Sequence, residues 1–183
     1  FGFIGEIGSN NTAIVTGSGS VWGNASILYV GYFGAGNSLV ISNQGAVFNS
    51  TGYVRFPTTG GNNTVLVTGT GSVWSNRGNL YVGNGGAGNS LVISNHGAVF
   101  NDSGYVGATS NNNSVLVTGP GSVWSNSSLL FVGFQGAGHS LVISNQGAVF
   151  NSTGSVGYNP HTSNTSVVVT GPGSVWDNSD SLT

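Results

Sequence analysis

The chain contains no cysteine, no methionine and no lysine among its 183 residues. It therefore has no disulfides, and an oxidising extracellular setting would tolerate this composition. Charged residues make up 3% of the chain, against about 25% in ordinary soluble domains. The net charge of -2 gives no basic footprint, which argues against a nucleic-acid partner. No apolar run is long enough to cross a membrane as a helix, so membrane insertion is not expected.

Titratable side chains are too few and too scattered to predict a reactive site. Acid–base catalysis needs a cluster of such groups in a cleft, and metal ligation needs a spacing that brings ligands together. We therefore expect no enzyme activity, cofactor or metal, although some β-helical folds do carry enzymes. The groups considered are Glu6, Arg55, Arg77, Asp102, Asp177 and Asp180, with the histidines His96, His139 and His161.

What the chain has in abundance is internal repetition. Its tryptophans Trp22, Trp74, Trp124 and Trp176 lie 52, 50 and 52 residues apart, and Phe48, Phe100 and Phe150 fall midway. The elementary period of about 26 residues is typical of solenoids. We predict one domain, residues 1–183, with repeat units at 11–36, 37–62, 63–88, 89–112, 113–138, 139–164 and 165–183.

Each unit contains three short apolar runs and no helical periodicity. In the unit 63–88 these runs are Val65–Val67, Ser72–Trp74 and Leu80–Gly83. Runs of three or four β-branched and aromatic residues are typical of short strands. The predicted fold class is all-β, a β-solenoid of about seven coils with three short strands per coil.

The corner after the first run alternates between glycine and asparagine, the two residues that best tolerate positive φ. A left-handed corner is therefore expected there. Two residues later glycine fills all seven units. His96 occupies the exposed turn tip where sister units have glutamine, while His139 lies at another corner and His161 in a variable loop.

The recurring sequence V-T-G-x-G-S-V-W-x-N, followed by L-Y-V-G and G-A-G-N-S-L-V-I-S-N-x-G-A-V-F, resembles a repeat of bacterial surface proteins. This repeat is found in autotransporter passengers and PEP-CTERM-associated proteins, and the resemblance covers nearly the whole chain. It implies a right-handed parallel β-helix that is secreted or displayed on a bacterial surface. It implies an adhesive or structural role and no catalytic residue.

Side chains alternate between the two sides of a strand, so strands that are apolar throughout must point some apolar residues outward. A column seven coils long measures about 34 Å and exceeds what a lone monomer usually exposes. We expect such columns to pack laterally against another chain, unless corner loops fold over them. The first column is Ile14, Val40, Leu66, Val92, Leu116, Val142 and Val168, and the second is Val21, Val47, Val73, Val99, Val123, Val149 and Val175.

Aromatic residues form two further columns. Exposed rings at Tyr29, Tyr53, Tyr81, Tyr105 and Phe131 could stack on sugars, so a carbohydrate-binding module is the alternative function. In the interior we predict one column that alternates tryptophan and phenylalanine from the second strands: Trp22, Phe48, Trp74, Phe100, Trp124, Phe150 and Trp176.

The two chain ends are expected to complement each other. The chain begins with Phe1 rather than Met, which suggests a mature, processed or partial sequence, and it stops where a third strand is due. Read across the junction, Leu182-Thr183 followed by Phe1–Gly5 matches Leu28–Gly34. A window of a longer repeat protein would show the same match. The last unit would be completed by residues 1–10 of a neighbour, through an axial interface of Phe1, Gly2, Phe3, Ile4, Gly5, Trp176, Ser181, Leu182 and Thr183.

These observations favour a structural extracellular or cell-surface protein, a fibre-forming or adhesin segment. Its expected partner is itself, head to tail and also laterally through the apolar faces. Surface glycans or other cells are the further partners considered.

Overall fold

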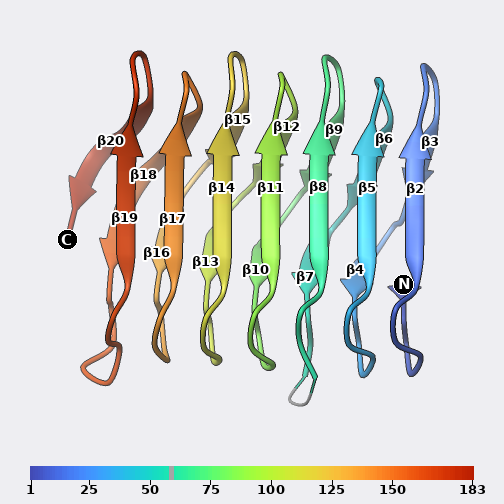
Figure 1. Cartoon of the computed structure of the whole chain (residues 1–183), viewed down its shortest axis with the longest axis horizontal. Coiled ribbons are helices and arrows are strands. Elements are labelled where there is room, and N and C mark those ends of the chain that lie inside the picture. Colours follow the sequence, from blue (N-terminus) through green and yellow to red (C-terminus); the bar gives the residue numbers. More distant parts are fainter. Residues whose placement is uncertain (58–59) are drawn as a thin grey trace.

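The repeat folds into a β-solenoid, as predicted. The computed structural model describes residues 1–57 and 60–183, so residues 58–59 of the unit 37–62 lie outside the described residues. The coils stack along the long axis of the molecule, with the two termini at opposite ends (Figure 1). Equivalent strands of successive coils pair in parallel. The first strand of each coil runs up the near side of Figure 1 and the chain returns on the far side while advancing toward the C-terminus, which is right-handed winding.

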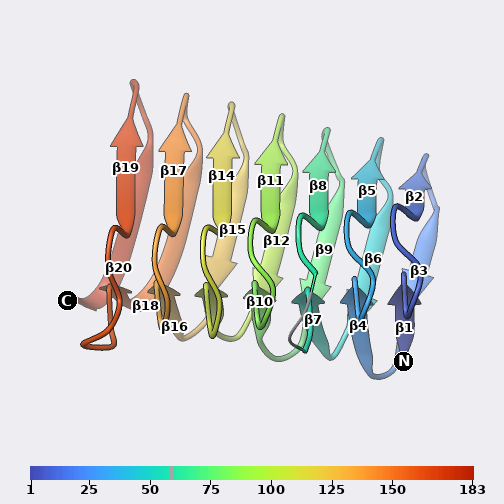
Figure 2. The ribbon, with the colours of Figure 1, turned by 60° about the horizontal axis from the view of Figure 1, so that its bottom comes forward.

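Three strands per coil produce three faces, and the coils are numbered 1 to 7 after the units 11–36 to 165–183. The first face is a seven-stranded sheet of first strands. Its members are β2 (Thr12–Thr16), β5 (Ser38–Ser42), β8 (Thr64–Thr68), β11 (Ser90–Ser94), β14 (Ser114–Thr118), β17 (Ser140–Ser144) and β19 (Ser166–Thr170). Figure 2 shows this face beside the other two.

The second and third faces form one thirteen-stranded sheet. The second face contains β3 (Val21–Gly23), β6 (Ala46–Asn49), β9 (Val73–Asn76), β12 (Ala98–Asn101), β15 (Val123–Asn126), β18 (Ala148–Val156) and β20 (Val175–Leu182). The third contains β1 (Gly2–Ile4), β4 (Ile27–Val30), β7 (Thr51–Val54), β10 (Leu80–Val82), β13 (Gly104–Val106) and β16 (Leu129–Val132). The faces merge because β18 continues around the corner and pairs with β15 of the second face and β16 of the third. β20 continues around the same corner and pairs with β18 along both parts.

The interior is one continuous apolar column. Each first strand of the inner coils turns two branched side chains inward, as Leu91 and Ile93 do in β11, and both are fully buried. The same positions in neighbouring coils lie directly above and below them in register. Burial of these side chains stabilises the stack, because each apolar residue of this size contributes about 1.5–3 kcal/mol.

The interior aromatic column was predicted wrongly. Trp74 and Trp124 do point inward and are fully buried, but Phe48, Phe100 and Phe150 are 45%, 42% and 38% exposed. The register explains the difference, since Val99 rather than Phe100 lies beside Trp74 and Trp124. Tryptophan therefore stacks on valine inside the coil, while phenylalanine faces outward beside serine.

A difference of one residue in the corners causes this shift. In the tryptophan coils the turn closes between Gly17 and Ser20, whereas in the phenylalanine coils it closes between Ser42 and Gly45. Thr16 and Ser42 are in register before the corner, so the tryptophan coils contain one extra residue. That residue reverses which side chains of the second strand point inward. The corner itself is left-handed, as expected, with φ of 50° at Asn43 and 96° at Gly17.

Candidate interaction surfaces

The first face carries an apolar stripe between two lines of hydroxyl groups. The aliphatic residues predicted to point outward do so; they are half-buried in the inner coils and exposed at Ile14 and Val168 in the end coils. On one side of the stripe the Ser42 hydroxyl donates to Thr16 Oγ1 at 2.9 Å, and Ser94 donates to Thr68 in the same way. The outward side chains of this face are Ile14, Val40, Leu66, Val92, Leu116, Val142 and Val168.

The second face differs from its predicted composition. Val21, Val73, Val123 and Val175 point outward, but Val47, Val99 and Val149 are fully buried. The extra corner residue of the tryptophan coils is again the reason, because it places each of these valines opposite an inward tryptophan. In the phenylalanine coils Ala46 and Phe48, Ala98 and Phe100, and Ala148 and Phe150 face outward instead.

The third face carries the aromatic ladder. Tyr29, Tyr53, Tyr81, Tyr105 and Phe131 stack with ring centroids 4.7–5.3 Å apart, and Phe3 extends the ladder at 5.2 Å from Tyr29. A second layer of rings leans on both ends of it: Tyr32, Phe56, Phe134 and Tyr158. Ring faces inside the ladder are thus occupied by neighbouring rings, which leaves edges for a sugar to contact. This geometry gives no support to sugar stacking along the column.

Burial changes the acidity of the ladder. Desolvation, followed by the charges of Tyr81 and Tyr29, raises the pKa of Tyr53 to about 12. Burial raises the pKa of Tyr29 and Tyr105 as well. The hydroxyl of Tyr81 accepts a hydrogen bond from Asn79 Nδ2 at 3.0 Å. Tyr29, Tyr53 and Tyr105 therefore stay protonated well above ordinary pH.

Two buried ladders of asparagine were not predicted from the sequence. At the corner before the first face, Asn37 donates from its backbone and its side chain to Asn63 Oδ1, at 2.9 and 3.1 Å. Asn63 does the same to Asn89, and Asn89 to Asn113. These side chains satisfy backbone groups that the corner would otherwise leave unpaired. The recurrence of asparagine at Asn37, Asn63, Asn89 and Asn113 was the available signal. A role was predicted from the sequence only for the asparagines of the next corner, Asn43, Asn95 and Asn145, as residues that tolerate positive φ.

The second asparagine ladder anchors the tryptophans. Trp74 Nε1 donates to Asn49 Oδ1 at 2.8 Å, and Trp124 and Trp176 make equivalent bonds to Asn101 and Asn151. Asn101 in turn donates to Asn126 at 2.7 Å. A buried indole N–H needs such a partner, so this ladder fixes the orientation of each ring.

His139 takes the place of asparagine in the first ladder. It is fully buried, not a surface corner residue as its position in the repeat suggested. Its Nδ1 accepts from the Asn113 backbone at 3.4 Å, and its Nε2 lies 3.0 Å from the Gln135 carbonyl oxygen. Desolvation lowers the pKa of His139 despite its backbone hydrogen bonds, so the imidazole is neutral in the fold.

Arg55 is the second buried residue that departs from the repeat. It adopts φ 83° at the corner where Gly31 and Gly83 also have positive φ, and its side chain is fully buried. Nη1 donates to the Gly34 carbonyl at 3.1 Å. Its Nε and Nη2 have no hydrogen-bond partner among the described residues, and burial lowers the pKa of the guanidinium.

The described residues contain no group of three or more His, Cys, Asp or Glu side chains placed to hold a metal ion. They also contain no helix long and apolar enough to span a membrane. Comparison of the chain with protein-family models, with curated proteins and with solved structures found no match.

At the axial ends, the two chain termini occupy equivalent positions. β1 pairs with β4 so that Gly2 lies beside Leu28 and Ile4 beside Val30. At the other end Leu182 lies beside Gly154, which is the same column as Gly2. The junction match was therefore wrong by three residues, because Ile4 rather than Phe1 takes the Val30 position. A shared coil forms only if one copy displaces its residues 181–183 or the other displaces residues 1–3.

Proposed function

We propose that this chain is a segment of a structural, extracellular β-solenoid, which serves as the rod of a surface fibre or adhesin. The observation that supports this most is the unbroken stack, in which the strand, asparagine and aromatic ladders run through successive coils. In a solenoid each coil contacts only its two neighbours, so the rod is held together along its length by the contacts between successive coils.

The rod extends axially by adding coils to its open ends. In coil 7 the inward residue Val169 is 46% exposed, while Ile143, in register with it in coil 6, is fully buried. A further coil would cover this apolar surface and pair the unpaired edge of β19. Either a second copy or further repeats of the same chain would supply such a coil. In a junction between two copies, residues 181–183 of coil 7 are displaced so that the incoming coil can pair.

The test is end-to-end assembly of the purified chain, followed by sedimentation velocity and electron microscopy. Val169→Lys places a charge on the open end, and the matched control Val168→Lys places it on the outer side of the same strand. We expect concentration-dependent polymers of the wild type and of Val168→Lys, and none of Val169→Lys. Intact mass spectrometry establishes that the polymer consists of separate chains. A wild type that stays monomeric at every concentration would contradict axial assembly between copies.

A further inference from the structure

The outer surface of the second face alternates between large and small side chains. Phe48, Phe100 and Phe150 project from coils 2, 4 and 6. The residues in register between and beyond them are small or short: Gly23, Ser75, Ser125 and Asp177 in coils 1, 3, 5 and 7. Neighbouring coils are about 4.8 Å apart, so two phenylalanines are separated by roughly 9.6 Å. This spacing leaves room for one further aromatic ring between each pair, over a serine.

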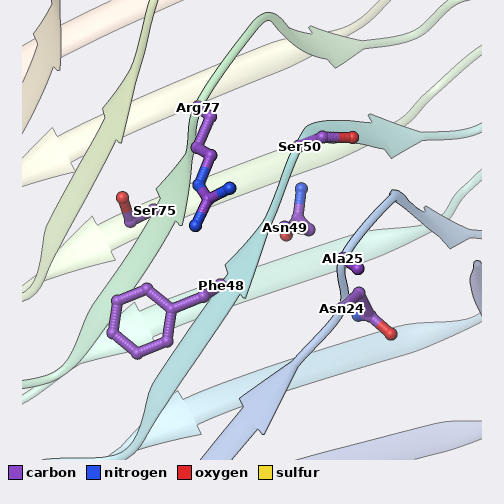
Figure 3. Close-up of a pocket in the computed structure, with 7 residues that line it drawn as sticks. All are labelled: Asn24, Ala25, Phe48, Asn49, Ser50, Ser75 and Arg77. Atoms are coloured by element: carbon purple, nitrogen blue, oxygen red, sulfur yellow. The ribbon is translucent and has the colours of Figure 1, made fainter.

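The neighbouring column has the opposite alternation. Val73 and Val123 lie on the serine coils, and Ala46, Ala98 and Ala148 lie on the phenylalanine coils. The face therefore presents staggered projections and depressions with a period of two coils. A shallow hollow of about 240 Å³ beside Phe48 is lined by Asn24, Ala25, Asn49, Ser50, Ser75 and Arg77. Figure 3 shows the Phe48 ring at the rim of this hollow, with the Arg77 side chain on the neighbouring strand.

An equivalent hollow lies four coils away, beside Phe150. It measures about 190 Å³, and Asn126, Ser127, Asn151, Ser152, Asp177 and Ser179 line it. The same relief is thus repeated along the molecule. Projections on even coils and depressions on odd coils make the surface complementary to itself when one copy is offset by one coil.

Two oppositely charged side chains favour one of the possible offsets between the coils of the two copies. Arg77 in coil 3 and Asp102 in coil 4 follow the ladder residues Asn76 and Asn101, so they hold equivalent positions along one edge of this face. Both are exposed, and Asp102 Oδ1 accepts from the Ser127 hydroxyl at 3.0 Å. A copy placed with coil 4 opposite coil 3 brings Arg77 against Asp102 of the other copy, twice by symmetry.

We propose that two copies of this chain pair laterally through the second face, with antiparallel solenoid axes and coil 4 of each copy opposite coil 3 of the other. The two-fold axis lies between the faces, parallel to the strands, so the two phenylalanine columns face each other. Phe100 then fits over Ser75 of the second copy, Phe48 over Ser125 and Phe150 over Gly23. The pairing deepens the proposed structural role by naming the lateral partner, and it needs no axial contact.

The size of the face sets the strength of the pair. Six coils of a four-residue strand cover roughly 29 Å by 13 Å, a smaller footprint than the about 800 Å² per partner of a standard stable interface. We therefore expect a reversible pair that forms at micromolar concentrations and strengthens when many coils line up along two rods. Interdigitated rings and the two Arg–Asp pairs supply its specificity.

The first test is sedimentation of Phe100→Ser in the Val169→Lys background, which separates lateral pairing from axial assembly. Serine is the residue that adjacent coils carry at this position, so the fold is preserved, as circular dichroism verifies. We expect pairing to weaken at least tenfold. The matched control Val142→Ser, on the outside of the first face, leaves pairing unchanged. Equal pairing of Phe100→Ser and its parent would overturn the proposal, whatever the result for axial polymers.

The second test reads the register. Arg77→Asp and Asp102→Arg should each abolish pairing by facing like charges across the interface, and the double exchange should restore it. Because the chain has no cysteine, mild oxidation of mixed single-cysteine variants gives an independent readout. Arg77→Cys with Asp102→Cys should cross-link faster than Asp102→Cys with Ser127→Cys. The reverse order, or failure of the double exchange to restore pairing, would overturn this register.

Discussion

At the scale of single residues, the tryptophans and the phenylalanines of the second strands have similar sequence contexts. They contribute very different amounts to the free energy of unfolding. Trp124 is fully buried, and its Nε1 donates to Asn101 Oδ1 at 2.8 Å. Trp124→Ala should cost about 3–5 kcal/mol of unfolding free energy through the cavity it leaves, with the Asn101 acceptor left unpaired in addition. Phe100→Ala should cost about 1 kcal/mol, because that ring is half in solvent. Urea unfolding of both variants measures the difference, and equal losses would show that the register of the second strands is wrong.

His139 makes stability depend on pH. Its pKa is lowered in the fold by desolvation, so the unfolded chain, with an ordinary histidine pKa of about 6.5, binds the proton first as the pH falls. Stability should therefore be full above about pH 6.5 and decline as the pH falls through the lowered folded value. His139→Asn, which restores the ladder residue of sister coils, should remove this part of the decline. Thermal unfolding across pH measures it, with His96→Gln as the exposed control; the same change in both variants would assign the effect elsewhere.

At the scale of strands and corners, the sequence predicted the elements well and their facing less well. Strand positions, the parallel stack and the left-handed first corner follow from the repeat and from the conformational freedom of Gly and Asn. The inward side of Ala98–Phe100 does not follow, because all three residues are apolar and the alternation has no visible phase. One extra corner residue decided it. The buried role of Asn37 and Asn63 was hidden for a similar reason, since asparagine also suits exposed turns.

The aromatic ladder should give the protein an alkaline limit. The pKa of Tyr53 is raised to about 12 in the fold, whereas an unfolded tyrosine ionises near pH 10. The unfolded chain loses its proton first as the pH rises, so stability should be full below about pH 10 and fall through pH 12. Tyrosinate absorbance measured alongside circular dichroism checks this. Tyr53→Phe should keep the ladder packing and reduce the loss, and an unchanged alkaline profile in this variant would contradict the assignment to Tyr53.

At the scale of the whole molecule, stability should depend on how many neighbouring coils cover a residue. A solenoid behaves as a line of coils coupled to their nearest neighbours, so the same side chain contributes differently at the centre and at an end. Val117 and Val169 hold the same inward position of the first strand, in coils 5 and 7. Val117 is covered by neighbouring coils on both sides and is fully buried, while Val169 is 46% exposed to solvent.

Val117→Ala should therefore cost about 2–3 kcal/mol, since it removes two buried carbon groups and leaves a cavity. Val169→Ala should cost well under 1 kcal/mol in the isolated chain, because water already reaches that side chain. Urea unfolding at low concentration, where chains are separate, measures both. At concentrations where axial polymers form, the cost of Val169→Ala should rise toward that of Val117→Ala, because a new coil then covers the site. A cost for Val169→Ala that stays the same while polymers form would show that assembly does not proceed through this end.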